Sequence, residues 1–180
     1  MPDSSPSLYQ DNLFDRLFIA LFRRKMAKAL GQRSALKGYA GFVDLSKKMM
    51  EGRSAQEQQA IVAIVLQSLV PGPVLALIRT LFNPTPLVCE LNAWFATVLF
   101  EWLVGPCTVK PVEIVTADGQ TRTQNSGVHI QKCRYLEESR CVGLCVNLCK
   151  MPTQRFFTEG FGIPLTIDRK STRLNSSHRT

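Results

Sequence analysis

The chain has 180 residues, of which 45% are hydrophobic and 20% are charged, and its formal net charge is +8. This length supports one well-buried core, and the composition excludes an intrinsically disordered chain. The last twelve residues hold four basic side chains and no acidic one, and without them the net charge falls to +4. The basic charge is therefore concentrated in the tail, and nucleic acid is not an expected partner.

The start of the chain shows no targeting signal. Its first ten residues, MPDSSPSLYQ, have neither the charged-then-apolar layout of a secretion signal nor the composition of a transit peptide. No transmembrane helix is expected either. The longest uncharged run, 58–78, is interrupted by the sequence PGP, and the apolar stretch 87–104 contains two glutamates, whose charges are costly inside a bilayer.

Residues 11–30 are predicted to form the first helix. Asp11 or Asn12 can cap its start, and Gly31 follows its last turn. We interpret it as a core-facing helix. The alternative is a membrane-surface helix, because five basic side chains crowd its polar face. Its apolar residues form two adjacent columns with a spacing of four: Leu13, Leu17 and Leu21 beside Phe14, Phe18 and Phe22.

Further helices are predicted as far as residue 104. One covers residues 39–51, and the next begins at Ser54, where Glu57 completes a capping box. The apolar segments 73–82 and 86–105 each have a proline near their start, where a missing N–H costs little. Since the last segment is apolar nearly all round, we expect it at the centre of the fold.

Strand patterns replace helical ones after the sequence GPC. The segments TVKPVEIV and VHIQKCRYL predict two short strands around a turn at residues 118–119, and the polar QTRTQNSG between them predicts a loose loop. Farther along, MPTQRFFTEGFG predicts a short helix that begins at Pro152 and ends at Gly160 or Gly162. The predicted fold class is α+β, mainly α: a helical bundle followed by a small hairpin and a cysteine-rich C-terminal module.

The chain is divided into a helical part, 8–104, a cysteine-rich module of the same compact domain, 105–168, and a tail, 169–180. The tail, RKSTRLNSSHRT, has no apolar period. We interpret it as non-native adapter or vector sequence joined to a truncated reading frame, and the alternative is a solvated basic tail. Setting the tail aside leaves His129 as the only histidine, which argues against a Ser-His-Asp triad and a multi-histidine zinc site.

Four of the six cysteines fall within seventeen positions: Cys133, Cys141, Cys145 and Cys149. The last three have the spacing i, i+4, i+8 and would form one stripe on a helix. Two thiolates on one ion lie at most about 4.6 Å apart, which adjacent members of the stripe can approach. The outer pair is separated by about 12 Å of helix rise, so one ion cannot bridge it on a straight helix.

Three interpretations of these cysteines stay open: a metal or iron–sulfur site, reduced structural residues, and disulfides, which the missing secretion signal disfavours. A site shared by all four requires the CVGLC segment to bend. Otherwise Cys133 and one adjacent pair bind, with His129, a carboxylate or water completing the shell. Along an extended strand, His129 lies about 13 Å from Cys133.

Other candidate groups give weaker evidence for a chemical role. Glu137 and Glu138 can act as oxygen ligands or as acid/base groups, but we interpret them as a solvated polar turn. Cys89 and Cys107 are interpreted as core residues. The sequence contains no P-loop, no dinucleotide-binding glycine motif and no nucleophile elbow. The cysteine segment is therefore the main candidate for chemistry.

The segments LVGPC and VHIQKCRYLEESRCVGLCVNLCKMPTQRFFTEGFGIPLT resemble the plastid β-carotene isomerases of strigolactone biosynthesis, the Dwarf-twenty-seven family. The segments SLYQDNLFDRLFI and VLQSLVP resemble the helical half of the same family, so the resemblance covers about residues 8–167. Beyond PLT, the family continues with an acidic stretch and a further cysteine, which the tail replaces here.

The resemblance implies an iron-dependent enzyme of plastids (chloroplasts) that interconverts all-trans-β-carotene and 9-cis-β-carotene. This reaction needs a weakened π bond, a hydrophobic slot and no net redox change, and an iron centre, mononuclear or in a cluster, supplies reversible one-electron chemistry. Together with the spacing of the cysteines, the resemblance makes the four clustered thiols the candidate iron ligands: Cys133, Cys141, Cys145 and Cys149. His129 is an additional candidate ligand.

The apolar helices offer candidate walls for a carotenoid, among them Trp94, Phe95, Phe100 and Trp102. Since β-carotene is almost insoluble in water, we also expect peripheral contact with the plastid membrane. The alternative function is a non-catalytic plastid protein that binds carotenoid or carries electrons through an iron–sulfur centre.

Overall fold

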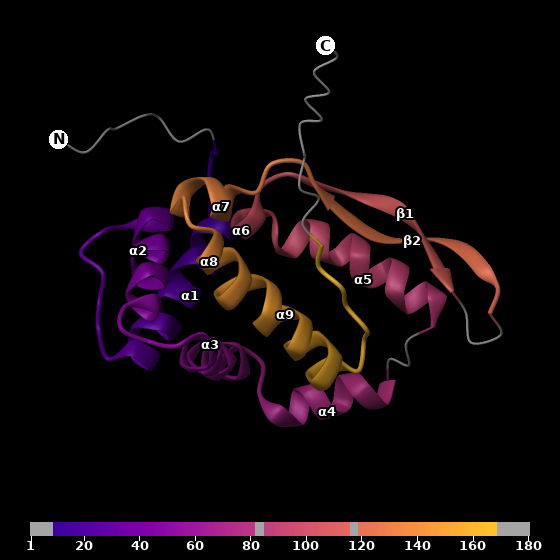
Figure 1. The fold of residues 1–180 in the computed structure, drawn as a ribbon, viewed down its shortest axis with the longest axis horizontal. Helices are drawn as coiled ribbons and strands as arrows, with labels where there is room; N and C mark the ends of the chain where they lie inside the picture. The colour runs from indigo at the N-terminus through magenta and orange to yellow at the C-terminus, as the bar shows by residue number, and fades with distance from the viewer. Residues whose placement is uncertain (1–8, 82–84, 116–118, 169–180) are drawn as a thin grey trace, which may run out of the picture.

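A computed structural model describes residues 9–81, 85–115 and 119–168. The first half is helical, and a two-stranded sheet separates it from a second helical region (Figure 1). The mainly α, α+β class predicted from the sequence is confirmed. The elements up to the sheet are α1 (Leu13–Leu30), α2 (Gly38–Met50), α3 (Ala55–Leu69), α4 (Gly72–Leu81), α5 (Pro86–Leu99), α6 (Glu101–Val104), β1 (Cys107–Val115) and β2 (Thr121–Ile130).

Helix α1 begins at a capping box. The Asn12 side chain accepts a hydrogen bond from the backbone N–H of Asp15, and the Asp15 carboxylate accepts one from the N–H of Asn12. The helix ends at Gly31 in the left-handed conformation, as the sequence predicts. The two apolar columns of α1 separate: Phe18 and Phe22 pack against the core, whereas the leucine column is exposed. The prediction of a core-facing helix is thus right for one column only.

Helices α2 and α3 agree with the sequence. Helix α3 starts at the predicted capping box, in which the Ser54 hydroxyl and the Glu57 carboxylate bind each other's backbone N–H groups. Helix α2 contributes Phe42, Leu45 and Met49 to the core, where Leu45 and Met49 are each only 1% exposed.

Helix α5 is not central to the fold, and this prediction is wrong. Only Ala93 is fully buried in it, while Leu87, Leu91 and Trp94 are among its exposed apolar residues. The helix lies beneath the hairpin (Figure 1). A helix that is apolar on all sides is expected to be buried, but the packing of the other elements decides whether it is covered.

The hairpin is longer than predicted. Strand β2 runs from Thr121 to Ile130 and pairs antiparallel with β1, so the polar segment expected to be a loose loop is a strand. The register shifts between Lys110 and Val112, around a proline that has no N–H to donate. The predicted turn falls partly on residues 116–118, which lie outside the described residues.

The cysteine-rich segment forms a short helix followed by a long helical run. The run is not uniform, because two of its segments have the wider π-helical winding. It ends at Gly162, as predicted, but it starts well before Pro152, so the predicted start is wrong. Its elements are α7 (Arg134–Ser139), α8 (Val142–Leu144), η1 (Cys145–Lys150), α9 (Met151–Arg155) and η2 (Phe156–Phe161).

The core joins the two helical regions. Trp102 is 1% exposed and packs against Phe22 and Phe42, with ring centroids 4.8 and 5.5 Å away. Tyr135 of α7 packs on Phe42, and Leu144 of α8 is fully buried in the same cluster. The hydrophobic core is therefore shared by residues before and after the hairpin.

Within the described residues, no single helix is both long enough and apolar enough to span a membrane. Helices α3 and α4 reach that length and composition only together, as a pair bent by 77°.

Candidate functional site

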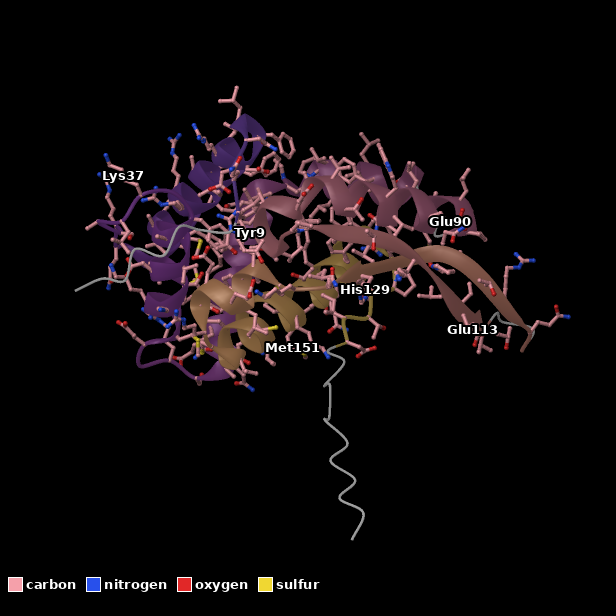
Figure 2. All side chains as sticks on the ribbon, turned by 90° about the horizontal axis from the view of Figure 1, so that it is seen from above. Tyr9, Lys37, Glu90, Glu113, His129 and Met151 are labelled. Carbon is pink, nitrogen blue, oxygen red and sulfur yellow. The ribbon has the colours of Figure 1, made fainter. Side chains whose placement is uncertain are left out.

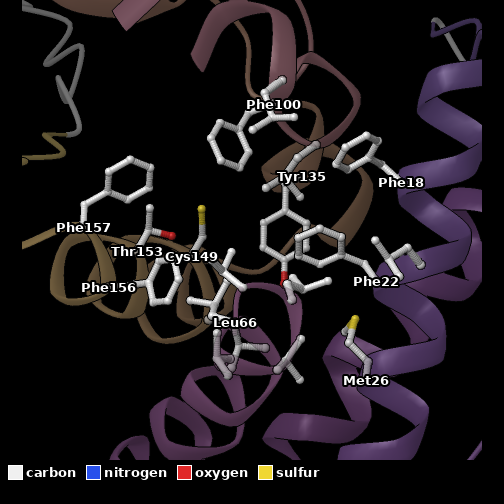
Figure 3. A pocket seen from close by; sticks show the side chains of 18 of the residues that line it. Phe18, Phe22, Met26, Leu66, Phe100, Tyr135, Cys149, Thr153, Phe156 and Phe157 are labelled. Carbon is white, nitrogen blue, oxygen red and sulfur yellow. The ribbon is translucent and has the colours of Figure 1, made fainter. Parts of the chain in front are cut away.

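A cavity of about 470 Å³ lies among α1, α3, α5 and the C-terminal helical run. This volume is within the usual range for small-molecule sites. Its wall is built mainly from aromatic and aliphatic side chains, and, of the described residues that line it, none is charged. Figure 3 shows aromatic rings reaching it from both helical regions, among them Phe18, Phe22, Phe100, Phe156 and Phe157.

A second cavity of about 300 Å³ adjoins the first, between α4, α5 and η2. Asn92, Phe95 and Phe161 line both cavities, so the two are neighbouring compartments along α5. The second wall is also apolar, with Ile78 and Leu91 among its residues. An elongated apolar molecule fits such a pair of compartments better than a compact polar one.

The sequence identifies part of this wall. Of the predicted wall residues, Phe95 and Phe100 line the main cavity. Trp102 lies in the core behind it, and Trp94 is 57% exposed outside it. The inner aromatic wall from α1 and α2 was missed, because only the fold shows that these helices face the cysteine-rich run.

Tyr135 is a buried polar group of the cavity wall that sequence reasoning missed. Burial raises the pKa of its phenol, and a hydrogen bond with Ser46 opposes that shift. Ser46 itself donates to the Phe42 carbonyl oxygen at 3.0 Å. Tyr135 lies within the cysteine segment quoted from the sequence, and this position was the available signal. Its phenol is neutral near pH 7 and points into the cavity region (Figure 3).

Cys149 also lines the cavity, opposite Phe22 and beside Tyr135 (Figure 3). Burial raises the pKa of its thiol to about 12, and nearby Cys145 and Cys133 add to the shift. The group is therefore an uncharged thiol at neutral pH, which suits an apolar wall and makes it a weak nucleophile.

Three of the four clustered cysteines, Cys149, Cys145 and Cys141, lie near Tyr135 and raise the pKa of its phenol further. The four cysteines do not lie along one straight α-helix. Cys141 precedes α8 with an extended backbone, and Cys145 and Cys149 belong to the π-helical η1. Cys133 is not on the strand either, because β2 ends at Ile130 and Cys133 caps the start of α7.

As they stand, the described side chains form no ready-made site for a single metal ion. In the part of the chain that the structure describes, no three His, Cys, Asp or Glu side chains are arranged to hold one metal ion. The described structure contains no disulfide among the six cysteines, and His129 is exposed on the hairpin, where it pairs with Thr108 (Figure 2). Iron bound by the clustered thiols therefore stays a prediction: Cys133, Cys141, Cys145 and Cys149, with His129 as a further candidate.

The remaining sequence candidates have structural contacts. Glu137 accepts a hydrogen bond from Tyr9 at 2.6 Å and pairs with Lys132, and these partners lower the pKa of its carboxyl. Burial raises the pKa of Cys107, whose thiol donates to a backbone carbonyl oxygen at 3.6 Å. Cys89 is half-buried in α5.

Comparison with known proteins finds a family model and two curated relatives that are similar to this chain. Residues 102–175 match the model of a family described as "Beta-carotene isomerase D27-like, C-terminal". The chain is 37% identical over 161 residues to "Beta-carotene isomerase D27, chloroplastic" of Medicago truncatula, covering 89% of this chain and 62% of that protein. It is 32% identical over 161 residues to the protein of the same name in Arabidopsis thaliana, covering 88% and 59%.

The chain thus spans about three fifths of the length of these relatives. No solved structure matches it. The match to the family model starts at Trp102 and includes the cysteine segment, and similarity to the two relatives extends through most of the helical part. Over these residues the chain is similar to the beta-carotene isomerase D27-like family.

Proposed function

We propose that this chain is a carotenoid cis/trans isomerase that interconverts all-trans-β-carotene and 9-cis-β-carotene in chloroplasts. The observation that carries the proposal is the cavity, whose described lining residues are mostly aromatic or aliphatic and include no charged one. A polyene hydrocarbon offers no group for an ion pair or a hydrogen bond, so burial of apolar area and ring contacts must bind it. The names of the two relatives specify the reaction class for those proteins.

The residues of the wall have defined roles in this proposal. The phenylalanines of both helical regions hold the polyene and exclude water from it. Rotation about one double bond changes no atom count and transfers no net electron. Tyr135 and Cys149 present neutral polar groups to the polyene, because burial raises the pKa of both.

Peripheral contact with the plastid membrane belongs to the same proposal, since the substrate dissolves in a bilayer and hardly in water. Helices α1 and α5 bring exposed apolar side chains to the rim of the cavity.

The test is conversion of all-trans-β-carotene, with isomers separated chromatographically. Ala96 lines the cavity and is half-buried, so Ala96→Trp fills the space that the polyene would occupy. Ala76 is exposed on α4, and Ala76→Trp is the matched control. We expect at least a tenfold loss of conversion in Ala96→Trp and an unchanged rate in Ala76→Trp.

Two results would count against the proposal. Equal conversion by both variants would place the substrate elsewhere. Carotenoid that co-purifies with unchanged isomer composition, without turnover by the wild type, would instead support a carotenoid-binding protein.

A further inference from the structure

The cavity opens between α1 and α5. Of the described residues that line it, Leu21 and Phe95 are the exposed ones, at 38% and 50%, and all the others are partly or fully buried. These two side chains come from different helices, which therefore form the two sides of the opening. Figure 2 shows α1 and α5 along one edge of the molecule, opposite the cysteine-rich run.

Apolar side chains continue outward from this opening on both helices. On α1, Leu17 and Leu13 precede Leu21 by one and two helical turns and are 65% and 83% exposed. On α5, the exposed residues beside Phe95 are Leu91, Trp94 and Val98. Single exposed apolar residues are common on monomers, but a continuous apolar rim around the mouth of an apolar cavity marks an interaction surface.

The exposed face of α1 is also basic. Arg24 and Lys28 lie one and two turns beyond Leu21 on the same face, and both are exposed. Arg16, also exposed, lies beside Leu13 and Leu17. The nearest acid, Asp15, is 9% exposed and occupied by the capping box. A helix that presents leucines and cations together, without an exposed acid, complements an anionic lipid surface.

We propose that this face docks the protein on an anionic bilayer with the cavity opening against the acyl chains. Leu13 and Leu17 enter the interface, while Arg24 and Lys28 contact the lipid headgroups. A polyene then passes from the bilayer to the cavity without crossing water. The route for a polyene rests on the proposed function, whereas the bilayer contact itself does not and is tested without carotenoid.

The experiment is co-sedimentation of the whole chain with vesicles of phosphatidylcholine, with and without phosphatidylglycerol. Leu13→Ser/Leu17→Ser removes apolar contacts, and Arg24→Glu/Lys28→Glu reverses the charges. None of the four residues lines the cavity. Matched controls change exposed residues far from α1 in the sequence: Val115→Ser/Val142→Ser and Lys110→Glu/Arg122→Glu.

We expect the wild type to sediment with anionic vesicles. Each α1 double variant should bind at least about tenfold more weakly, because one loses two basic contacts with the anionic surface and the other loses two apolar side chains from the interface. Both controls should bind like the wild type. Circular dichroism of every variant confirms that its helices remain folded.

Other outcomes overturn the proposal. An equal loss of vesicle binding in the α1 variants and in their controls would show nonspecific binding to lipid rather than a docking face on α1. Wild-type protein that does not sediment with anionic vesicles would refute docking on a bilayer. A dimer that the α1 variants dissociate, without a change in vesicle binding, would assign the face to a second copy of the chain. Isomerisation of detergent-dispersed carotenoid, measured separately, distinguishes these results from failure of the proposed function.

Discussion

Arg134 joins the N-terminal segment to the start of the cysteine-rich region. Its guanidinium donates to both carboxylate oxygens of Asp11, at 2.5 and 3.3 Å, and to the Trp102 carbonyl oxygen at 3.2 Å. It also lies 3.7 Å from the centre of the Tyr39 ring and 5.1 Å from that of Tyr9. Arg134 is only 3% exposed, so these contacts replace the water that a buried cation loses.

The first prediction concerns this pair. Asp11→Asn removes the anion that faces the buried guanidinium, and we expect the free energy of unfolding to fall by about 2 kcal/mol. The control is Glu159→Gln, which breaks an exposed i, i+4 pair with Arg155 and should cost less than about 0.5 kcal/mol. Urea unfolding followed by circular dichroism measures both. Equal effects would mean that the Arg134 contacts add nothing beyond those of a surface pair.

The second prediction concerns the three tyrosines of the chain. Burial, aided by a hydrogen bond with Glu137, raises the pKa of Tyr9 to about 12. Burial also raises the pKa of Tyr39 and Tyr135 well above the ordinary value. Unfolded tyrosine titrates near pH 10. We therefore expect the phenolate absorbance of the native chain to stay low through pH 10 and that of the urea-unfolded chain to rise there.

The sign of the effect on stability follows from these shifts. The folded chain keeps its phenols neutral, so their contribution to stability is complete below pH 10 and is lost as the pH rises above it. Alkaline unfolding should begin in that range. A native titration curve that coincides with the curve in urea would contradict the burial described here.

At the scale of elements, α1 and α3 were predictable because residues close together in the sequence determine where each helix starts. A capping box needs only two residues three positions apart, and both boxes are present in the structure. The first seven residues of β2 were expected to be a loop because most of their side chains are exposed, so they show no alternation of apolar and polar residues. The existence of the strand depends on pairing with β1 and on α5 beneath it, neither of which is local.

The π-helical winding of η1 and η2 was not predictable. The sequence suggested that the cysteine segment must bend for four thiols to share a site, and the segment does depart from a straight α-helix. Wide turns of this kind occur often at functional sites. The thiols of Cys141, Cys145 and Cys149 lie near Tyr135, but the described residues contain no ready-made site for a metal ion.

The third prediction concerns iron. The amount of iron per chain is to be measured in four single variants: Cys133→Ser, Cys141→Ser, Cys145→Ser and Cys149→Ser. The control is Cys89→Ser, because Cys89 lies on α5, outside the cysteine cluster. Loss in all four, with normal iron in the control, supports a shared site and implies that the thiols rearrange on binding. Normal iron in Cys141→Ser or Cys149→Ser supports a smaller site, and normal iron in every variant would refute ligation by these thiols.

At the scale of the whole molecule, the cavity is a product of long-range packing. Its wall combines α1 and α2 with the run from η1 to η2, which lies about a hundred residues later in the chain. Apolar spacing identifies which residues avoid water, but it does not tell a core contact from a cavity wall. The cysteine segment led to the family and to one side of the cavity, through Cys149, and the fold supplied the other sides.

The same scale explains the exposed apolar side chains of α1 and α5. Leu17 of α1 and Trp94 of α5 are apolar side chains that are 65% and 57% exposed. Here they flank the entrance to an apolar cavity. Their exposure is consistent with a surface that is covered while the protein works, and the vesicle experiment tests which surface covers it.

The central claim is that the cavity catalyses interconversion of two carotenoid isomers. The most direct measurement starts from both sides: pure all-trans-β-carotene and pure 9-cis-β-carotene are incubated with the protein in separate samples, in detergent. A catalyst changes the rate but not the equilibrium, so both samples should reach the same isomer ratio, faster than with heat-killed protein. Isomer ratios that stay apart, or that move no faster than in the heat-killed control, would contradict the account.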